Sequence, residues 1–244
     1  MDALSLFADG VYRQVVEFAA AVTALGLVVM AIIQSAKDLL PVRRWFHDAF
    51  VRAWLAHKAR GHAARGGIRP DAGVAFDDLV ELATTGDAHA LFDLPIEQLA
   101  AQVAAAASQS LDYPARHEDL VRCLAASADP RDLAAILGAA PEALSRDDAA
   151  NAEIDARTRV MHQVQRSVDA LQISAGYRWR WYLQLTAFAL SAALTLTAVV
   201  AAGGDAPLTR RLVDALPLAF VGGFIAPVAR DAIARLTKPP QALR

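Results

Sequence analysis

The chain has 244 residues, of which 55% are hydrophobic, 20% charged and 7% aromatic. The hydrophobic share exceeds the roughly 45–50% of ordinary soluble domains, which excludes an intrinsically disordered or collagen-like chain. The formal net charge is −2 at pH 7, so the chain has no overall basic field, and no nucleic-acid partner is expected. The single cysteine, Cys123, excludes an intramolecular disulfide framework and a CxxC metal site. What remains is a membrane protein with a modest soluble portion.

Two stretches are apolar enough to cross a bilayer, whose core of about 30 Å needs about 20 helical residues. The first lies within residues 11–36 and the second is 181–204, and each has an uncharged run of the required length. A buried helix of a soluble protein is the alternative, but it is seldom apolar on every face over this length. Acidic residues before the first stretch and basic residues after it argue against a cleaved signal peptide. We therefore predict two transmembrane helices, the first beginning near Val11.

A third segment, residues 212–229, is predicted to be a kinked span, with a re-entrant or interfacial helix as the alternative. It contains Asp214 and several prolines and glycines, which membrane helices tolerate better than soluble ones. Counting Lys and Arg near the ends of three spans places 11 on one side and 3 on the other. The positive-inside rule then predicts a bacterial inner-membrane protein with an external amino terminus. Residues 37–180 and the tail, 230–244, are expected in the cytoplasm.

Aromatic and basic residues alternate at two predicted membrane boundaries. Amphipathic rings settle at the headgroup level and arginines extend towards phosphate, so both segments are typical of interface anchors. The adjoining basic residues also favour contact with anionic lipid. The predicted anchors are Arg43, Arg44 and Trp45 after the first span, and Tyr177, Arg178, Trp179, Arg180, Trp181 and Tyr182 at the start of the second.

Between the first two spans, residues 37–180 are predicted to form an all-α cytosolic domain of about five shorter helices. Pro95 is expected at the first position of one helix and Asp129 at the N-cap of another. Ser145 is expected to cap the next element. Four glycines and a proline in 60–73 predict a mobile loop, and Cys123 is expected to be a buried apolar residue.

Residues 145–180 are predicted to form a long amphipathic helix that leads into the second span. Apolar residues recur in it with heptad spacing over about three heptads. Packing on the domain itself is the plain explanation, and association around an oligomer axis is the alternative. Gly176 either softens the helix or lies within an unbroken one. The candidate oligomer seam consists of Ile154, Met161, Val164, Val168 and Leu171.

Small residues also recur with helical spacing in the predicted spans, which favours close approach of helices in lipid. Ala20, Ala24, Ala31 and Ser35 form such a stripe in the first span. Ala187, Ser191, Thr195, Ala198 and Ala202 form one in the second.

No catalytic, nucleotide-binding or metal-binding motif occurs in the sequence, so no enzymatic activity, cofactor or metal site is predicted. Two acidic residues lie near the outer ends of predicted spans, Glu17 and Asp214. In an oligomer they are candidates for a cation-collecting ring at a pore mouth. The alternative is that both lie in interfacial water, paired with Arg13, Arg210 or Arg211.

The segment from Ser167 to Tyr182, SVDALQISAGYRWRWY, resembles a group of uncharacterised bacterial inner-membrane proteins. Its members are similar in having an amino-terminal span, a helical cytosolic insert and an Asp-containing amphipathic helix that leads into carboxyl-terminal spans. The resemblance implies a topology and no catalytic residues. We expect a non-enzymatic homo-oligomeric scaffold assembled through its cytosolic helical domain. The alternatives are an oligomeric ion channel or pore, and a sensor or effector subunit in stress or phage defence with an unidentified protein partner.

Overall fold

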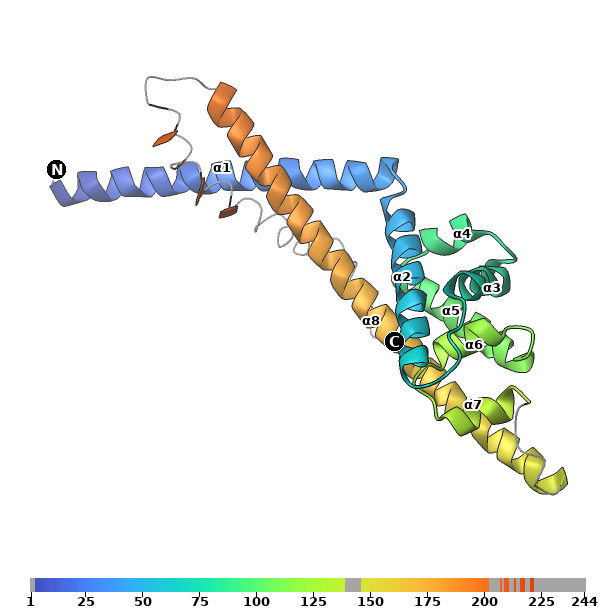
Figure 1. Ribbon diagram of the computed structural model, residues 1–244. Helices are drawn as coiled ribbons and strands as arrows, with labels where there is room; N and C mark the ends of the chain where they lie inside the picture. Colours follow the sequence, from blue (N-terminus) through green and yellow to red (C-terminus); the bar gives the residue numbers. More distant parts are fainter. Residues whose placement is uncertain are drawn as a thin grey trace, which may run out of the picture. The chain divides into compact units, whose positions relative to one another are not determined.

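The computed structural model describes residues 3–138 and 146–201, together with 207, 209–210, 213, 216–217 and 220–221. The prediction of an all-α chain is confirmed, because these residues contain no β-strand and define eight helices (Figure 1). The helices are α1 (Ala3–Leu39), α2 (Val42–Ala64), α3 (Ala72–Thr84), α4 (Ala88–Asp93), α5 (Ile96–Asp112), α6 (Glu118–Leu124), α7 (Pro130–Ile136) and α8 (Arg146–Ala201).

The helices belong to two compact units. The helical domain runs from Pro41 to Trp179 and contains α2 to α7 with the amino-terminal part of α8. The apolar unit contains the described residues up to Leu40 and from Arg180 onwards, and therefore α1 with the rest of α8. Helix α8 is unbroken through Gly176, as expected if the long amphipathic helix continues directly into the second span.

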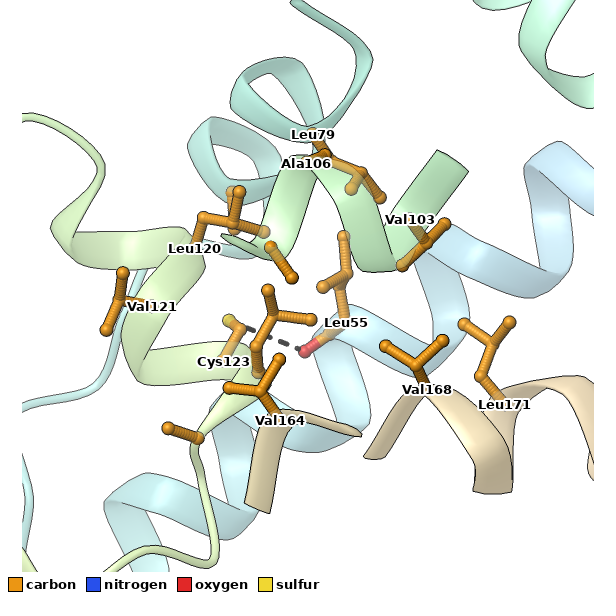
Figure 2. Packing of buried hydrophobic residues seen from close by; sticks show 14 of the residues in the cluster. Leu55, Leu79, Val103, Ala106, Leu120, Val121, Cys123, Val164, Val168 and Leu171 are labelled. Atoms are coloured by element: carbon orange, nitrogen blue, oxygen red, sulfur yellow. Dashed lines mark hydrogen bonds between the residues drawn. The ribbon is translucent and has the colours of Figure 1, made fainter. Parts of the chain in front are cut away.

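The helical domain is built around one hydrophobic core. Buried side chains from α2 to α7 meet there with five residues of α8, of which Val164, Val168 and Leu171 are labelled in Figure 2. Cys123 is fully buried, as predicted, and its thiol lies 3.9 Å from the carbonyl oxygen of Leu55. The largest buried side chains of this core are Phe92, Leu55, Leu79, Leu91, Leu99, Leu111, Leu120, Leu124 and Leu171.

Aspartates set the starts of three short helices. The carboxylate of Asp71 accepts hydrogen bonds from two backbone N–H groups of α3, and Asp87 accepts one from α4. Asp129 accepts one from the N–H of Arg131 at 2.8 Å, which confirms its predicted N-cap role. Such caps satisfy backbone donors that the first helical turn leaves free. Pro95 occupies the N-cap of α5 instead of the predicted first helical position.

The predicted loop at 60–73 is wrong at both ends, and at its carboxyl end α3 already begins at Ala72. Helix α2 continues through Gly61 to Ala64, and the turn begins only at Arg65, with Gly66 at a φ of +85°. A glycine inside a helix costs about 1 kcal/mol. Burial of Leu55, Ala59 and His62 on one face of α2 stabilises the last turns despite that cost.

Two helices in the described residues are long and apolar enough to cross a membrane, within Val16–Lys37 of α1 and Asn151–Ala201 of α8. Only 17% of the most apolar stretch of each is buried within the protein. Helix α1 begins at Ala3 and not near Val11, because Ala, Leu and Ser before Gly10 are compatible with helix. The predicted span 212–229 lies mostly outside the described residues, and its described residues, 213, 216–217 and 220–221, are helical. The predicted cap Ser145 also lies outside the described residues.

Candidate membrane interface

The amino-terminal turns of α2 carry basic and aromatic residues at one end of the helical domain. Pro41 precedes α2, and Arg43, Phe46, His47 and Phe50 follow at spacings of three or four residues, so they lie along one face of the helix. Arg43 reaches the carbonyl oxygen of Asp93 at 3.5 Å. This end of α2 is therefore fixed against α4.

The predicted anchor segment on α8 meets this same face of α2. The ring of Trp179 lies 5.1 Å from that of Phe46, centroid to centroid, and 6.5 Å from that of His47. The guanidinium of Arg178 lies over the ring of Phe50 at 5.6 Å. Aromatic pairs and cation–π contacts at these distances are attractive. The first and last parts of the domain, about 130 residues apart in sequence, are thus side by side in space.

His47 joins this cluster to the domain core. Its imidazole is 3% exposed, and Nδ1 lies 3.0 Å from the carbonyl oxygen of Phe92. Burial lowers the pKa of His47, and the nearby Arg43 acts in the same direction, against the raising effects of the Phe92 carbonyl and Asp93. The imidazole is therefore neutral near pH 7, with Nδ1 as the donor to that carbonyl.

The other predicted anchors divide between exposed and half-buried positions. Trp45 is 57% and Tyr177 63% exposed, so both rings face outwards from the helical domain. Arg44 and Trp179 are half-buried. In the apolar unit Trp181 and Tyr182 are about half exposed and contact each other edge to face, with ring centroids 5.8 Å apart, and the residue preceding them, Arg180, is exposed.

Within the apolar unit, α1 and α8 pack through small and β-branched residues. Val29 of α1 and Ala187 of α8 form the buried centre, and Leu25, Ile33, Leu190 and Leu194 surround it. Ser191 and Thr195 are also buried, so three members of the predicted α8 stripe lie at a helix contact. On α1 the inward face carries Val22, Gly26 and Val29, whereas Ala20, Ala24, Ala31 and Ser35 of the predicted stripe are exposed.

The candidate pore-mouth acid Glu17 is ion-paired within its own helix. Its carboxylate lies 3.1 Å from the guanidinium of Arg13, one turn earlier, and both side chains are largely exposed. This is the pairing that the non-pore alternative predicts, and it neutralises the charge of the acid locally. Asp214 lies outside the described residues.

Most of the candidate oligomer seam packs inside one chain, as the plain intramolecular explanation predicts. Val164, Val168 and Leu171 are at most 4% exposed, and Met161 packs against the same core. Apolar residues at heptad spacing bury themselves against whichever surface is available, and here α2 and its neighbours supply it. Ile154 is the exception, at 63% exposed.

Sequence reasoning missed His47 and Phe50 of this interface, and it did not predict the contact of Phe46 with Trp179. Their signal was present in the sequence, since positions 43, 46, 47 and 50 follow the helical i, i+3, i+4, i+7 pattern. Their partners on α8, Trp179 for Phe46 and His47 and Arg178 for Phe50, cannot be predicted from that pattern.

Comparisons of the chain with protein-family models, with curated proteins and with solved structures found no match. The resemblance of residues 167–182 to bacterial inner-membrane proteins therefore stays a prediction.

Proposed function

We propose that this protein is a non-enzymatic scaffold of the bacterial inner membrane, anchored by α1, by residues 181–201 of α8 and by a third span at 212–229. One observation carries the membrane part of the proposal. The points where the chain enters and leaves the helical domain lie together, with Phe46 and Trp179 in contact. The candidate spans adjoin these two points along the chain.

The surfaces of the two candidate spans support a lipid environment. On α1, Phe18, Val28 and Ile32 are more than 40% exposed, and Leu185 and Phe188 on α8 are similar. Each exposed apolar Å² costs about 25 cal/mol in water, and monomeric soluble proteins seldom leave contiguous apolar patches beyond a few hundred Å². A bilayer core removes this cost along the full length of a spanning helix.

Charge supports the cytoplasmic placement of the domain. Arg43, Arg44 and Arg178 border the two entry points, where the positive-inside rule expects basic residues on the cytoplasmic side. Trp45 and Tyr177 extend outwards at the same end, as rings at the headgroup level do. Anionic lipid is the expected partner of this end of the domain.

Assembly into a homo-oligomer is the less constrained part of the proposal. Because α8 buries its heptad residues in its own domain, the domain uses other faces for assembly, and the spans offer a further surface. The exposed stripe of Ala20, Ala24, Ala31 and Ser35 on α1 has the small residues that allow two helices to approach closely in lipid. The ion pair of Glu17 with Arg13 is the pairing expected if Glu17 does not line a pore, and it supports the scaffold as the function we favour.

Three measurements separate the parts of this proposal. Alkaline carbonate extraction of bacterial membranes should leave the full-length chain in the pellet, and protease added to intact spheroplasts should spare the helical domain. Release into the supernatant would contradict membrane insertion, and digestion from outside would contradict the orientation. Mass measurement in nanodiscs should find more than one chain per particle, and a strict monomer would overturn assembly while leaving insertion intact.

A further inference from the structure

A cavity of about 160 Å³ lies at the end of the helical domain formed by the carboxyl terminus of α2, by α6 and by α7. Its walls differ in chemistry. Three of the lining residues have nitrogen-rich side chains, His62, Arg65 and Arg122, and the others are small or apolar. The apolar lining residues are Ala126, Ala128, Pro130, Leu133, Ala134 and Leu137.

Both guanidiniums are held in place with donors to spare. Arg65 donates to the carbonyl oxygen of Ala126, and Arg122 binds the carboxylate of Glu118 at 2.6 Å. The Arg122 side chain is only 18% exposed. Each guanidinium has five N–H donors, so further donors remain for a ligand. The half-exposed carboxylate of Glu118 neutralises only one of the two positive charges of Arg65 and Arg122, so the lining has a net positive charge.

His62 adds a buried group without a partner. Its side chain is 7% exposed, and Nε2 is buried with no hydrogen-bond partner among the residues that the structure describes. A buried polar atom left without a partner is destabilising, and an acceptor bound next to it offsets part of that cost. Burial lowers the pKa of His62, and Arg122 and Arg65 lower it further, so the imidazole is neutral and offers one N–H.

Gly67 makes room for this imidazole. A Cβ atom at position 67 would lie 2.3 Å from Nε2 of His62, well inside contact distance. Glycine is therefore needed for the ring to occupy its place in the cavity wall.

We propose that this cavity binds a single phosphate group, either as free phosphate or on a short organic chain, through Arg65, Arg122 and His62. A guanidinium group matches the geometry of phosphate oxygens, and charge-assisted hydrogen bonds of this kind are the strong ones. The cavity is large enough for a phosphate group, since a cavity of about 150 Å³ holds a molecule the size of benzene. A nucleotide needs the larger clefts of about 300–1,000 Å³ that hold drug-sized ligands.

The position of the cavity indicates a soluble source for the phosphate. Trp45 and His62 are 17 residues apart on α2, which is about 26 Å at 1.5 Å per residue. A lipid headgroup at the Trp45 end is out of reach of His62 over that distance. The choice of source rests on the proposed membrane position of the domain, whereas the binding site itself does not.

The test is calorimetric titration of the full-length protein with inorganic phosphate, in nanodiscs of zwitterionic phosphatidylcholine, with sodium chloride at equal ionic strength as the reference. We expect saturable binding to one site per chain. Arg65→Met and Arg122→Met should each weaken it about tenfold or more. Arg60→Met is the matched control, because Arg60 is exposed on the same helix and does not line the cavity, and it should bind like the wild type. Absence of binding to the wild type, or equal losses in all three variants, would overturn the proposal.

Two further arms complete the experiment. Gly67→Ala keeps both charges but displaces the imidazole, so weaker binding with an unchanged CD spectrum supports the role of His62, and unchanged binding refutes it. If an arginine variant fails to fold, Gly67→Ala still tests whether phosphate binds in this cavity. Nanodiscs containing phosphatidylglycerol should leave phosphate affinity unchanged, and competition by that lipid would overturn the soluble source.

Discussion

Replacing Leu171 by alanine tests whether α8 is a core helix of the domain or the seam of an oligomer. Leu171 is completely buried among residues of the same chain (Figure 2). The change deletes three carbon atoms, whose transfer from water is worth about 0.8 kcal/mol each, and it leaves a cavity whose cost adds to that value. We expect a loss of about 3–4 kcal/mol in the free energy of unfolding of the helical domain.

A loss of this size is readily measured. At about 3 °C per kcal/mol for a domain of this length, the Tm of Leu171→Ala should fall by about 10 °C. The assay is thermal unfolding followed by far-UV CD in nanodiscs, repeated over a hundredfold range of protein concentration. Ile173→Ala is the control, because Ile173 lies on the same helix and is 72% exposed, and its Tm should change by less than about 2 °C.

The intramolecular account also predicts that the Tm of the domain does not depend on protein concentration, since no partner chain contributes to the core. A Tm that rises with concentration, and a Leu171→Ala protein that loses oligomers without losing domain stability, would refute the reasoning and restore the seam hypothesis.

Three further predictions concern side chains of the helical domain. Burial raises the pKa of the Cys123 thiol to about 12, so a thiol reagent at about pH 8 should modify the native protein far more slowly than the urea-unfolded chain. Burial lowers the pKa of both His47 and His62, so on acidification the unfolded chain takes up protons before the folded one. The free energy of unfolding, measured by urea titration, should therefore be constant above about pH 6.5 and fall below it. The fall should be smaller in His47→Gln. Phe46→Ala removes the ring beside Trp179 and should cost about 1–2 kcal/mol, with red-shifted emission in a variant that retains only Trp179.

Local features of the fold were predictable where the signal lies in neighbouring residues. The N-cap at Asp129 and the burial of Cys123 follow from short patterns, and the structure confirms both. Where two local effects compete, the prediction was wrong. Glycines at 61 and 66 indicated one loop, but only Gly66 adopts a positive φ, and Gly61 lies in a helix that is stabilised by burial of its opposite face.

Long-range partners were not predictable from the sequence. The heptad positions Val164, Val168 and Leu171 required an apolar partner, and periodicity does not state whether it belongs to the same chain. The phosphate cavity shows the same limit. His62 and Arg65 are close in sequence, but Arg122 is 57 residues further along and meets them only because α6 packs against α2.

The most direct test of the membrane account is quenching of tryptophan fluorescence by lipids brominated on their acyl chains. Two variants of the full-length chain are compared in proteoliposomes, one that retains only Trp181 and one that retains only Trp54, with the other three tryptophans replaced by phenylalanine. Trp181 begins the second predicted span and is 48% exposed, whereas Trp54 packs against the core of the helical domain. We predict strong quenching of Trp181, greatest for bromines near the headgroups, and none of Trp54. Equal quenching of both, or quenching of neither, would contradict a bilayer-spanning α8 with a domain in water.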